Sequence, residues 1–144
     1  SAFRGESRSL PPVQEMPVVC GRPEMSGCKG KERAMKRKVK ITVIRREYYQ
    51  ELADRFLVNP GTGKCSLFEE GQEFIVTKEN YDRFPYENKF CMAAWDIIKI
   101  KVYSALQGGN FYWEGWMKDP KEQILCCDDG VRPVVFLLER MEEE

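Results

Sequence analysis

The 144-residue sequence contains no histidine. Histidine is the side chain whose ordinary pKa lies nearest neutral pH, and it is the commonest metal ligand in proteins. Its absence excludes Ser-His and Cys-His nucleophile pairs, imidazole-bound zinc and the iron site made from two histidines and one carboxylate. Any acid-base chemistry near neutral pH must therefore use another residue type.

The sequence also lacks net charge and long apolar runs. The 23 Lys and Arg residues balance 23 Asp and Glu residues, which argues against a protein built around nucleic-acid phosphates. No run of about 20 apolar residues occurs, so the sequence predicts no membrane-spanning helix. We therefore expect a cytoplasmic protein with neither a nucleic-acid nor a membrane partner.

Aromatic residues are scarce before Met35. Residues 1–34 contain Phe3 alone among the aromatic residues, together with four of the eight prolines. This composition predicts a disordered N-terminal extension. A purine-rich codon run encoding residues 31–33 would resemble a bacterial ribosome-binding site, and it favours the alternative that residues 1–34 are a translated leader before a start at Met35. Both interpretations leave residues 35–144 as a single domain.

Apolar periodicity within this domain predicts the element order β-α-β-α-β-β. Alternating apolar and polar residues indicate strands over 38–45, 73–77, 123–127 and 134–140. The order predicts a small α+β domain with a mostly antiparallel sheet packed by one long and one short helix. The last four residues, 141–144, are expected to be a solvated end.

Two segments have helical spacing. The shorter, residues 47–57, places Tyr48, Leu52 and Phe56 on one face. The longer, residues 92–107, carries an apolar stripe and is followed by a Gly-Gly pair, which is typical of a helix end. Residues 80–89 include a proline and are expected to form a loop.

Four cysteines fall within the predicted domain: Cys65, Cys91, Cys126 and Cys127. Reduced cysteines of a cytosolic protein are more often metal ligands or reactive thiols than parts of a disulfide framework. If Cys126 and Cys127 lie in a strand, they point to opposite faces and only one of them can join the other two, whereas a bulge at the pair could bring both in. Three thiolates with Asp128, water or a substrate as fourth ligand favour zinc or an iron–sulfur cluster. The alternative is that these cysteines are small apolar fillers of the core.

Cys91 has the strongest case for a reactive thiol. It stands at the start of the longer predicted helix, where unpaired N–H groups and the helix dipole stabilise a thiolate.

An aromatic loop is predicted over residues 110–120. Its partner-binding candidates are Phe111, Trp113 and Trp116, since exposed aromatic residues often carry the binding energy of an interface. The alternative is that these rings fold back over the core.

Two cysteine-containing segments are similar to a known family. They read C-x-L-F-x-x-G-Q-x-F at residues 65–74 and C-C-x-D-G-x-R-P-V at residues 126–134, and Cys91 with Ala94-Trp95 lies between them. The chain from Met35 to Glu142 resembles a family of small uncharacterised proteins found mainly in anaerobic bacteria and archaea. The resemblance implies a fold unit and an anaerobic habitat, but no reaction.

Two functional hypotheses follow. The first is a small cytosolic protein that binds a metal or iron–sulfur centre, or performs thiol redox chemistry, through clustered cysteines. The second is a non-enzymatic protein-binding or accessory module with structural cysteines and an aromatic contact loop. The sequence leaves open whether the protein is an enzyme.

Overall fold

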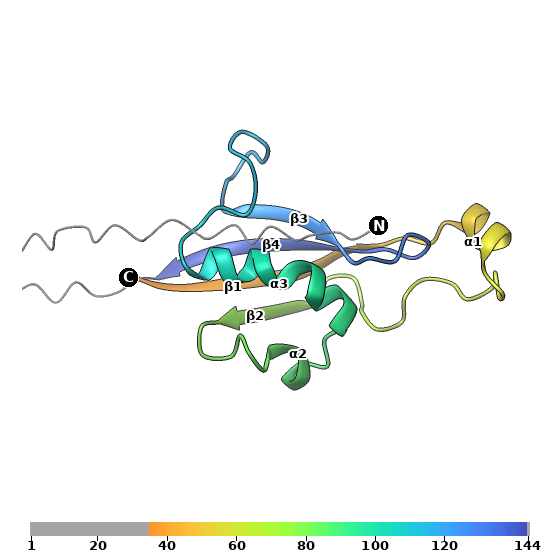
Figure 1. Cartoon of the computed structure of the whole chain (residues 1–144), viewed down its shortest axis with the longest axis horizontal. Helices are drawn as coiled ribbons and strands as arrows, with labels where there is room; N and C mark the ends of the chain where they lie inside the picture. The colour runs from red at the N-terminus through yellow and green to blue at the C-terminus, as the bar shows by residue number, and fades with distance from the viewer. Residues whose placement is uncertain (1–34, 144) are drawn as a thin grey trace, which may run out of the picture. The chain divides into compact units, whose positions relative to one another are not determined.

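A computed structural model describes residues 35–143 of the chain (Figure 1). The predicted disordered extension or leader, with Cys20 and Cys28, lies outside these residues. The described part contains four strands and three helices: β1 (Lys36–Arg46), α1 (Gln50–Phe56), β2 (Glu73–Thr77), α2 (Phe84–Glu87), α3 (Met92–Leu106), β3 (Glu122–Cys126) and β4 (Val134–Glu143).

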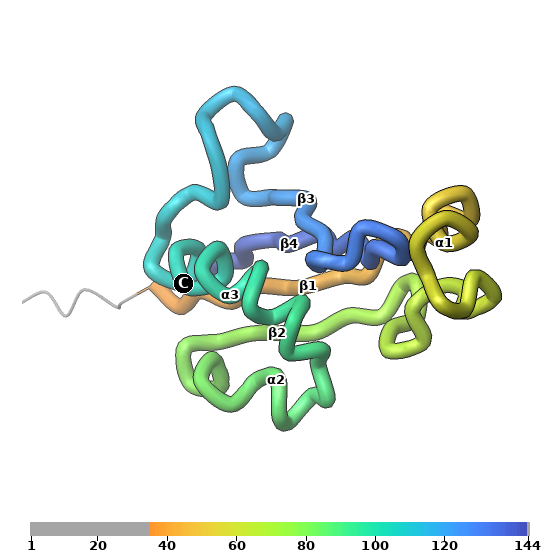
Figure 2. Tube along the Cα trace, turned by 45° about the vertical axis from the view of Figure 1, so that its right-hand side comes forward, coloured from red at the N-terminus to blue at the C-terminus, as the bar shows by residue number. Residues whose placement is uncertain are grey.

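The four strands form one antiparallel sheet in the order β2-β1-β4-β3. The two long strands β1 and β4 occupy its centre, and the two five-residue strands form its edges. Helix α3 lies over one face of the sheet (Figure 2). The predicted small α+β domain with a mostly antiparallel sheet is therefore confirmed.

The alternating residues of β1 explain which face is covered. Val39, Ile41 and Val43 are fully buried, and their neighbours Lys40 and Thr42 are only half-buried on the opposite face. That opposite face carries ion pairs from Lys40 Nζ to Glu139, at 3.1 Å, and to Glu73, at 3.9 Å. The period of two in the sequence thus separates an apolar face under α3 from a polar face.

Aromatic rings form the centre of the core. Phe68, from the segment between α1 and β2, is 2% exposed, and its ring lies edge-on to three other rings. The ring centroids are 6.2 Å apart for Phe74, 5.0 Å for Phe90 and 5.2 Å for Phe136. Edge-to-face packing at these separations is favourable because the ring edge is positive and the ring face is negative.

Helix α3 agrees with its predicted range and its predicted stripe. Its buried residues are Ala94, Trp95, Ile98, Val102 and Ala105. Gly108, two residues beyond the helix, has a φ of +87°, a conformation that glycine adopts without a Cβ penalty. The sequence pattern thus located both the helix and its end.

The predicted helix over 47–57 needs correction. Helix α1 begins only at Gln50, its one buried residue is Ala53, and Phe56 is 67% exposed. The backbone N–H groups of Glu47 and Tyr49 instead donate to carbonyls in the segment before β4. Helix α1 lies beyond the end of the sheet (Figure 1), so the predicted apolar face has no sheet to cover.

The predicted loop over 80–89 contains a short helix that sequence reasoning missed. Helix α2 has Pro85 in its first turn, where the absence of an N–H group removes no intrahelical hydrogen bond. Phe84, at its first position, is fully buried in the aromatic core. Proline was therefore a helix-starting residue here rather than a sign of a loop.

The aromatic core predicts a large stability difference between two adjacent positions. Phe68→Ala should lower the free energy of unfolding by about 3–5 kcal/mol, because it leaves a cavity among three rings. Leu67, the neighbouring residue, is 61% exposed, so Leu67→Ala should change this free energy by less than about 0.5 kcal/mol. Urea unfolding of both variants measures the difference, and equal losses would contradict the assigned core.

Candidate functional site

The aromatic loop runs from Gly109 to Lys121 and connects α3 to β3. Within it, Tyr112 is 46%, Trp113 77% and Trp116 67% exposed. The predicted contact role of Phe111 is wrong, since Phe111 is only 2% exposed and belongs to the hydrophobic core. The aromatic residues therefore divide into one ring that anchors the loop and three that face solvent.

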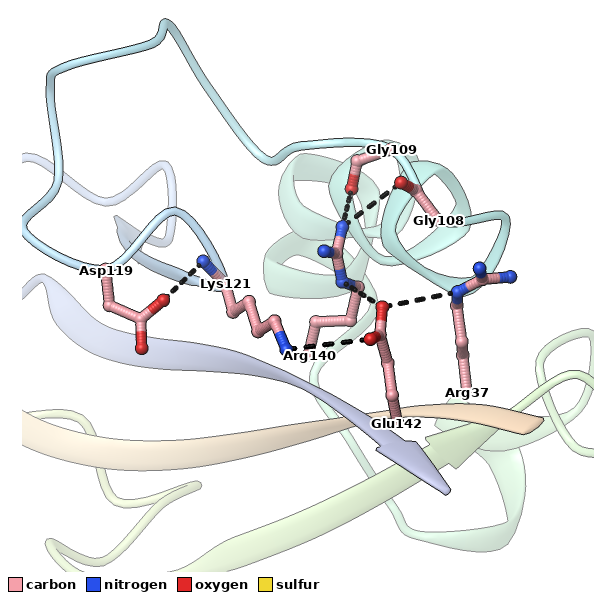
Figure 3. Close-up of polar contacts among 7 residues, drawn as sticks. All are labelled: Arg37, Gly108, Gly109, Asp119, Lys121, Arg140 and Glu142. Carbon is pink, nitrogen blue, oxygen red and sulfur yellow. Dashed lines mark hydrogen bonds and ion pairs between the residues drawn. The ribbon is translucent and has the colours of Figure 1, made fainter. Parts of the chain in front are cut away.

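Arg140 of β4 holds both ends of the aromatic loop. Its guanidinium donates to the carbonyl oxygens of Gly109, at 2.6 Å, and Gly108, at 3.2 Å (Figure 3). Its backbone N–H donates to the carbonyl oxygen of Lys121, at 2.8 Å. One residue thus fixes the distance between the start and the end of the loop.

Glu142 gathers three cations beside this anchor. Its carboxylate lies 3.1 Å from Arg140 Nε, 3.5 Å from Arg37 Nε and 3.6 Å from Lys121 Nζ (Figure 3). Desolvation alone raises the pKa of the Glu142 carboxyl group, but the positive charges of Lys121, Arg140 and Arg37 outweigh it and lower this pKa. The expectation that residues 141–144 are simply a solvated end is wrong for Glu142, whose side chain is 23% exposed.

Contacts between rings order the tip of the loop. The ring centroid of Tyr112 lies 6.3 Å from that of Trp113 and 5.9 Å from that of Trp116. The backbone N–H of Trp116 donates to the carbonyl oxygen of Trp113, at 3.2 Å, which closes a turn between the two indoles. Lys101 Nζ of α3 lies 5.0 Å from the Tyr112 ring centroid, a cation–π distance. The exposed rings are thus held by one another and by α3.

The cysteines lie on two sides of the sheet. Cys65 is buried in the hydrophobic core, and Cys91 and Cys127 pack against that core. Cys126, the last residue of β3, is exposed. The predicted opposition of the adjacent cysteines agrees with this placement, and Cys127 is the one that shares the core side with Cys65 and Cys91.

The contacts of Cys127 and Cys91 show no arrangement for binding a metal. Cys127 Sγ accepts a hydrogen bond from the backbone N–H of Val134 at 3.3 Å. Cys91 is the residue directly before the first turn of α3, as predicted, but its side chain makes no capping hydrogen bond. Within residues 35–143, no three Cys, Asp or Glu side chains are grouped so as to hold a metal ion. The cysteine site remains a prediction.

The neighbouring aspartates have separate environments. Asp128, the predicted fourth ligand, is exposed. Asp129 accepts hydrogen bonds from the backbone N–H groups of Val131, at 2.9 Å, and Arg132, at 3.1 Å. Desolvation raises the pKa of Asp129, but these bonds and the Arg132 guanidinium lower it below its usual value. Asp129 therefore stabilises the turn that leads into β4.

No protein-family model, curated protein or solved structure matches this chain. The described helices include none that is long and apolar enough to span a membrane. The resemblance based on residues 65–74 and 126–134 stays a prediction.

Sequence reasoning missed Arg140 and Glu142. Both stand among charged residues at the end of the chain, and a charged strand residue usually indicates a solvated face. The alternation of β4 carried part of the signal, because Arg140 and Glu142 continue the period of two set by the buried residues Val134, Phe136 and Leu138. What the local pattern does not show is the partners of Arg140, Gly109 and Gly108, which lie 31 and 32 positions away in the chain.

The anchor predicts a local effect of removing Arg140. Arg140→Met should lower the free energy of unfolding by about 1–3 kcal/mol, because two loop carbonyls lose their donor and the Glu142 carboxylate loses one of its three cations. Amide hydrogen exchange should rise over residues 109–121 and stay unchanged in β1. The control, Arg45→Met, removes an arginine that is 70% exposed and pairs only with Glu47. A rise in exchange spread evenly over both regions would contradict a local anchor.

The cysteine hypothesis makes its own prediction. If a metal or cluster is bound, protein purified without oxygen should contain zinc or iron, and Cys127→Ser should remove it while Cys126→Ser retains it. The contrast follows from the core-side position of Cys127 and the exposed position of Cys126. Elemental analysis measures the metal, and wild-type protein without zinc or iron would refute the metal hypothesis.

Proposed function

We propose that this chain is a non-enzymatic protein-binding or accessory module whose contact surface is the aromatic loop. The observation that carries the proposal is that Trp113 and Trp116 are 77% and 67% exposed on a loop that Arg140 holds at both ends. Tryptophan and tyrosine dominate the energetic centres of protein interfaces. Together with Tyr112, these two indoles leave a large apolar area exposed to water when no partner is bound.

The fixed loop ends favour binding through preorganisation. A mobile loop loses conformational entropy when it docks, and each ordered side chain adds about 0.5–1.5 kcal/mol to that cost. Arg140 restrains the loop backbone, and the contacts from Tyr112 to both indoles restrain the rings before a partner arrives. More of the free energy from burying the indoles is then retained as affinity.

The shifted pKa values lie away from the aromatic loop. Among the described residues, the shifted groups are Tyr81, between β2 and α2, and members of ion pairs: Lys40, Lys99, Asp129, Glu142 and Glu143. None of them belongs to the exposed part of the aromatic loop, so the proposal for this loop is one of binding and involves no titrating group.

A reducing compartment suits the proposed module. The four cysteines among the described residues are free thiols, one of them exposed, and thiols persist in the cytoplasm because glutathione and thioredoxin keep them reduced. We therefore propose the cytoplasm as the location of the module and its partner.

Affinity capture with loop variants tests the proposal. The double variant Trp113→Ala/Trp116→Ala should lose the partner that the wild-type chain retains from an extract of its source cells, with an affinity loss of at least about thirtyfold. The matched control is Tyr86→Ala, since Tyr86 of α2 is 73% exposed but lies in another element.

Circular dichroism should show the same folded spectrum for all three proteins. A partner retained by wild type and Tyr86→Ala but lost by the double variant supports the module. Identical capture by all three proteins contradicts it.

A further inference from the structure

A small hollow lies between the aromatic loop and β3. It is lined by the loop residues Asn110, Tyr112, Trp113 and Glu114 and by the β3 residues Glu122 and Gln123, among others, and its volume is about 180 Å³. Pockets that enclose a drug-sized molecule or a cofactor usually measure about 300–1,000 Å³. This hollow therefore suits one side chain of a partner rather than a cofactor.

The charged groups of the hollow carry one sign. Glu114 and Glu122 line it, and no Lys or Arg is among the lining residues. Lys121, next to Glu122 in the chain, directs its Nζ to Glu142 at 3.6 Å instead. A lining with two carboxylates and no cation favours a positively charged occupant.

Gln123 gives an independent indication of a missing donor. The side chain is 4% exposed, and its Nε2 donates to the carbonyl oxygen of Ile124 at 2.9 Å. That bond fixes the amide orientation, because a carbonyl oxygen accepts only. Its Oε1 is buried and accepts no hydrogen bond from the described residues. An unsatisfied buried acceptor destabilises a fold, so a ligand that donates to it recovers free energy.

The aromatic walls suit a cation as well. Lys101 Nζ already lies 5.0 Å from the ring centroid of Tyr112, so one face of this ring has its cation, and Trp113 is the wall left for the occupant. Trp113, the other ring of the hollow, is 77% exposed, and the indole face is the most attractive aromatic surface for a cation.

We propose that the hollow receives an arginine side chain of the partner protein. The inference rests on the proposed function, since it names the chemistry of the partner segment that the aromatic loop recognises. The guanidinium stacks on an aromatic wall and pairs with Glu114 and Glu122.

Geometry favours arginine over lysine. A guanidinium is planar and presents five N–H donors, so it stacks on a ring and serves several acceptors at the same time. An ammonium group is a compact, strongly hydrated charge with three donors, and it loses more hydration on entering a hollow lined by rings.

Titration with a small arginine derivative tests the inference without the partner. The full-length ¹⁵N-labelled chain is titrated with Nα-acetyl-arginine amide, and the indole N–H signal of Trp113, identified from Trp113→Phe, reports binding. Nα-acetyl-citrulline amide supplies the same shape without charge, and Nα-acetyl-lysine amide supplies the charge without the plane. The arginine derivative should bind most tightly and the citrulline derivative should leave the signal unmoved.

Variants of the lining connect this binding to the hollow. Glu114→Gln and Glu122→Gln should each weaken binding of the arginine derivative about threefold to fivefold, the range for a partly exposed ion pair. Glu87→Gln, which changes an exposed carboxylate of α2, should leave it unchanged.

Three results would overturn the inference: equal binding of the citrulline derivative, equal binding of the lysine derivative, or affinity that is unchanged in both glutamate variants. Failure of the proposed function is a separate result. If capture of a partner requires Trp113 and Trp116 but not Glu114 and Glu122, the module stands and the arginine site fails. If the arginine derivative binds while no captured partner depends on the indoles, the site stands and the module fails.

Discussion

Arg140 is the contact on which the candidate site depends. Its backbone belongs to the β4 ladder, and its N–H holds the end of the aromatic loop at Lys121. Its side chain holds the beginning of the loop at the carbonyls of Gly108 and Gly109. One residue of the sheet therefore holds both ends of the loop by hydrogen bonds. Hydrogen bonds from a charged donor contribute more than neutral ones, and this donor is only 10% exposed.

Glu142 reduces the repulsion among the three cations that surround the anchor at Arg140. Three cations converge on Glu142: Arg37 from the start of β1, Lys121 from the end of the loop and Arg140 from the end of β4. Without a countercharge, these three cations would repel one another. The Glu142 carboxylate reduces that repulsion, and its lowered pKa reflects the same attraction. The charged end of the chain thus has a structural role, which its composition alone conceals.

The fold was largely predictable because it depends on local periodicity. The alternation in residues 38–43 selected the face of β1 that α3 covers, and the apolar stripe of α3 with Gly108 gave both its range and its end. The exceptions are segments whose structure depends on tertiary packing. Helix α1 lies beyond the sheet, so its amphipathic pattern had nothing to cover, and α2 forms where the Phe84 ring packs against Phe74, Phe90 and Trp95.

The candidate site was predictable only in part, for the same reason. Sequence composition identified the aromatic loop, and its Trp113 and Trp116 are exposed as a contact surface requires. Composition could not distinguish these two residues from Phe111, which is buried. Position along the loop decides this: Phe111 lies two residues after the anchored Gly109, within reach of the core, and the indoles lie beyond it.

This division of rings separates folding from binding. Burial of Phe111 stabilises the free protein, whereas the exposed indoles contribute no core contacts and leave apolar area in water. The unsatisfied Oε1 of Gln123 adds a second local cost beside the same loop. Locally destabilising features of this kind are retained at binding sites, because the bound partner relieves them. Both features lie beside the same hollow, whose lining includes Trp113 and Gln123, and an occupant of that hollow would cover the exposed indole.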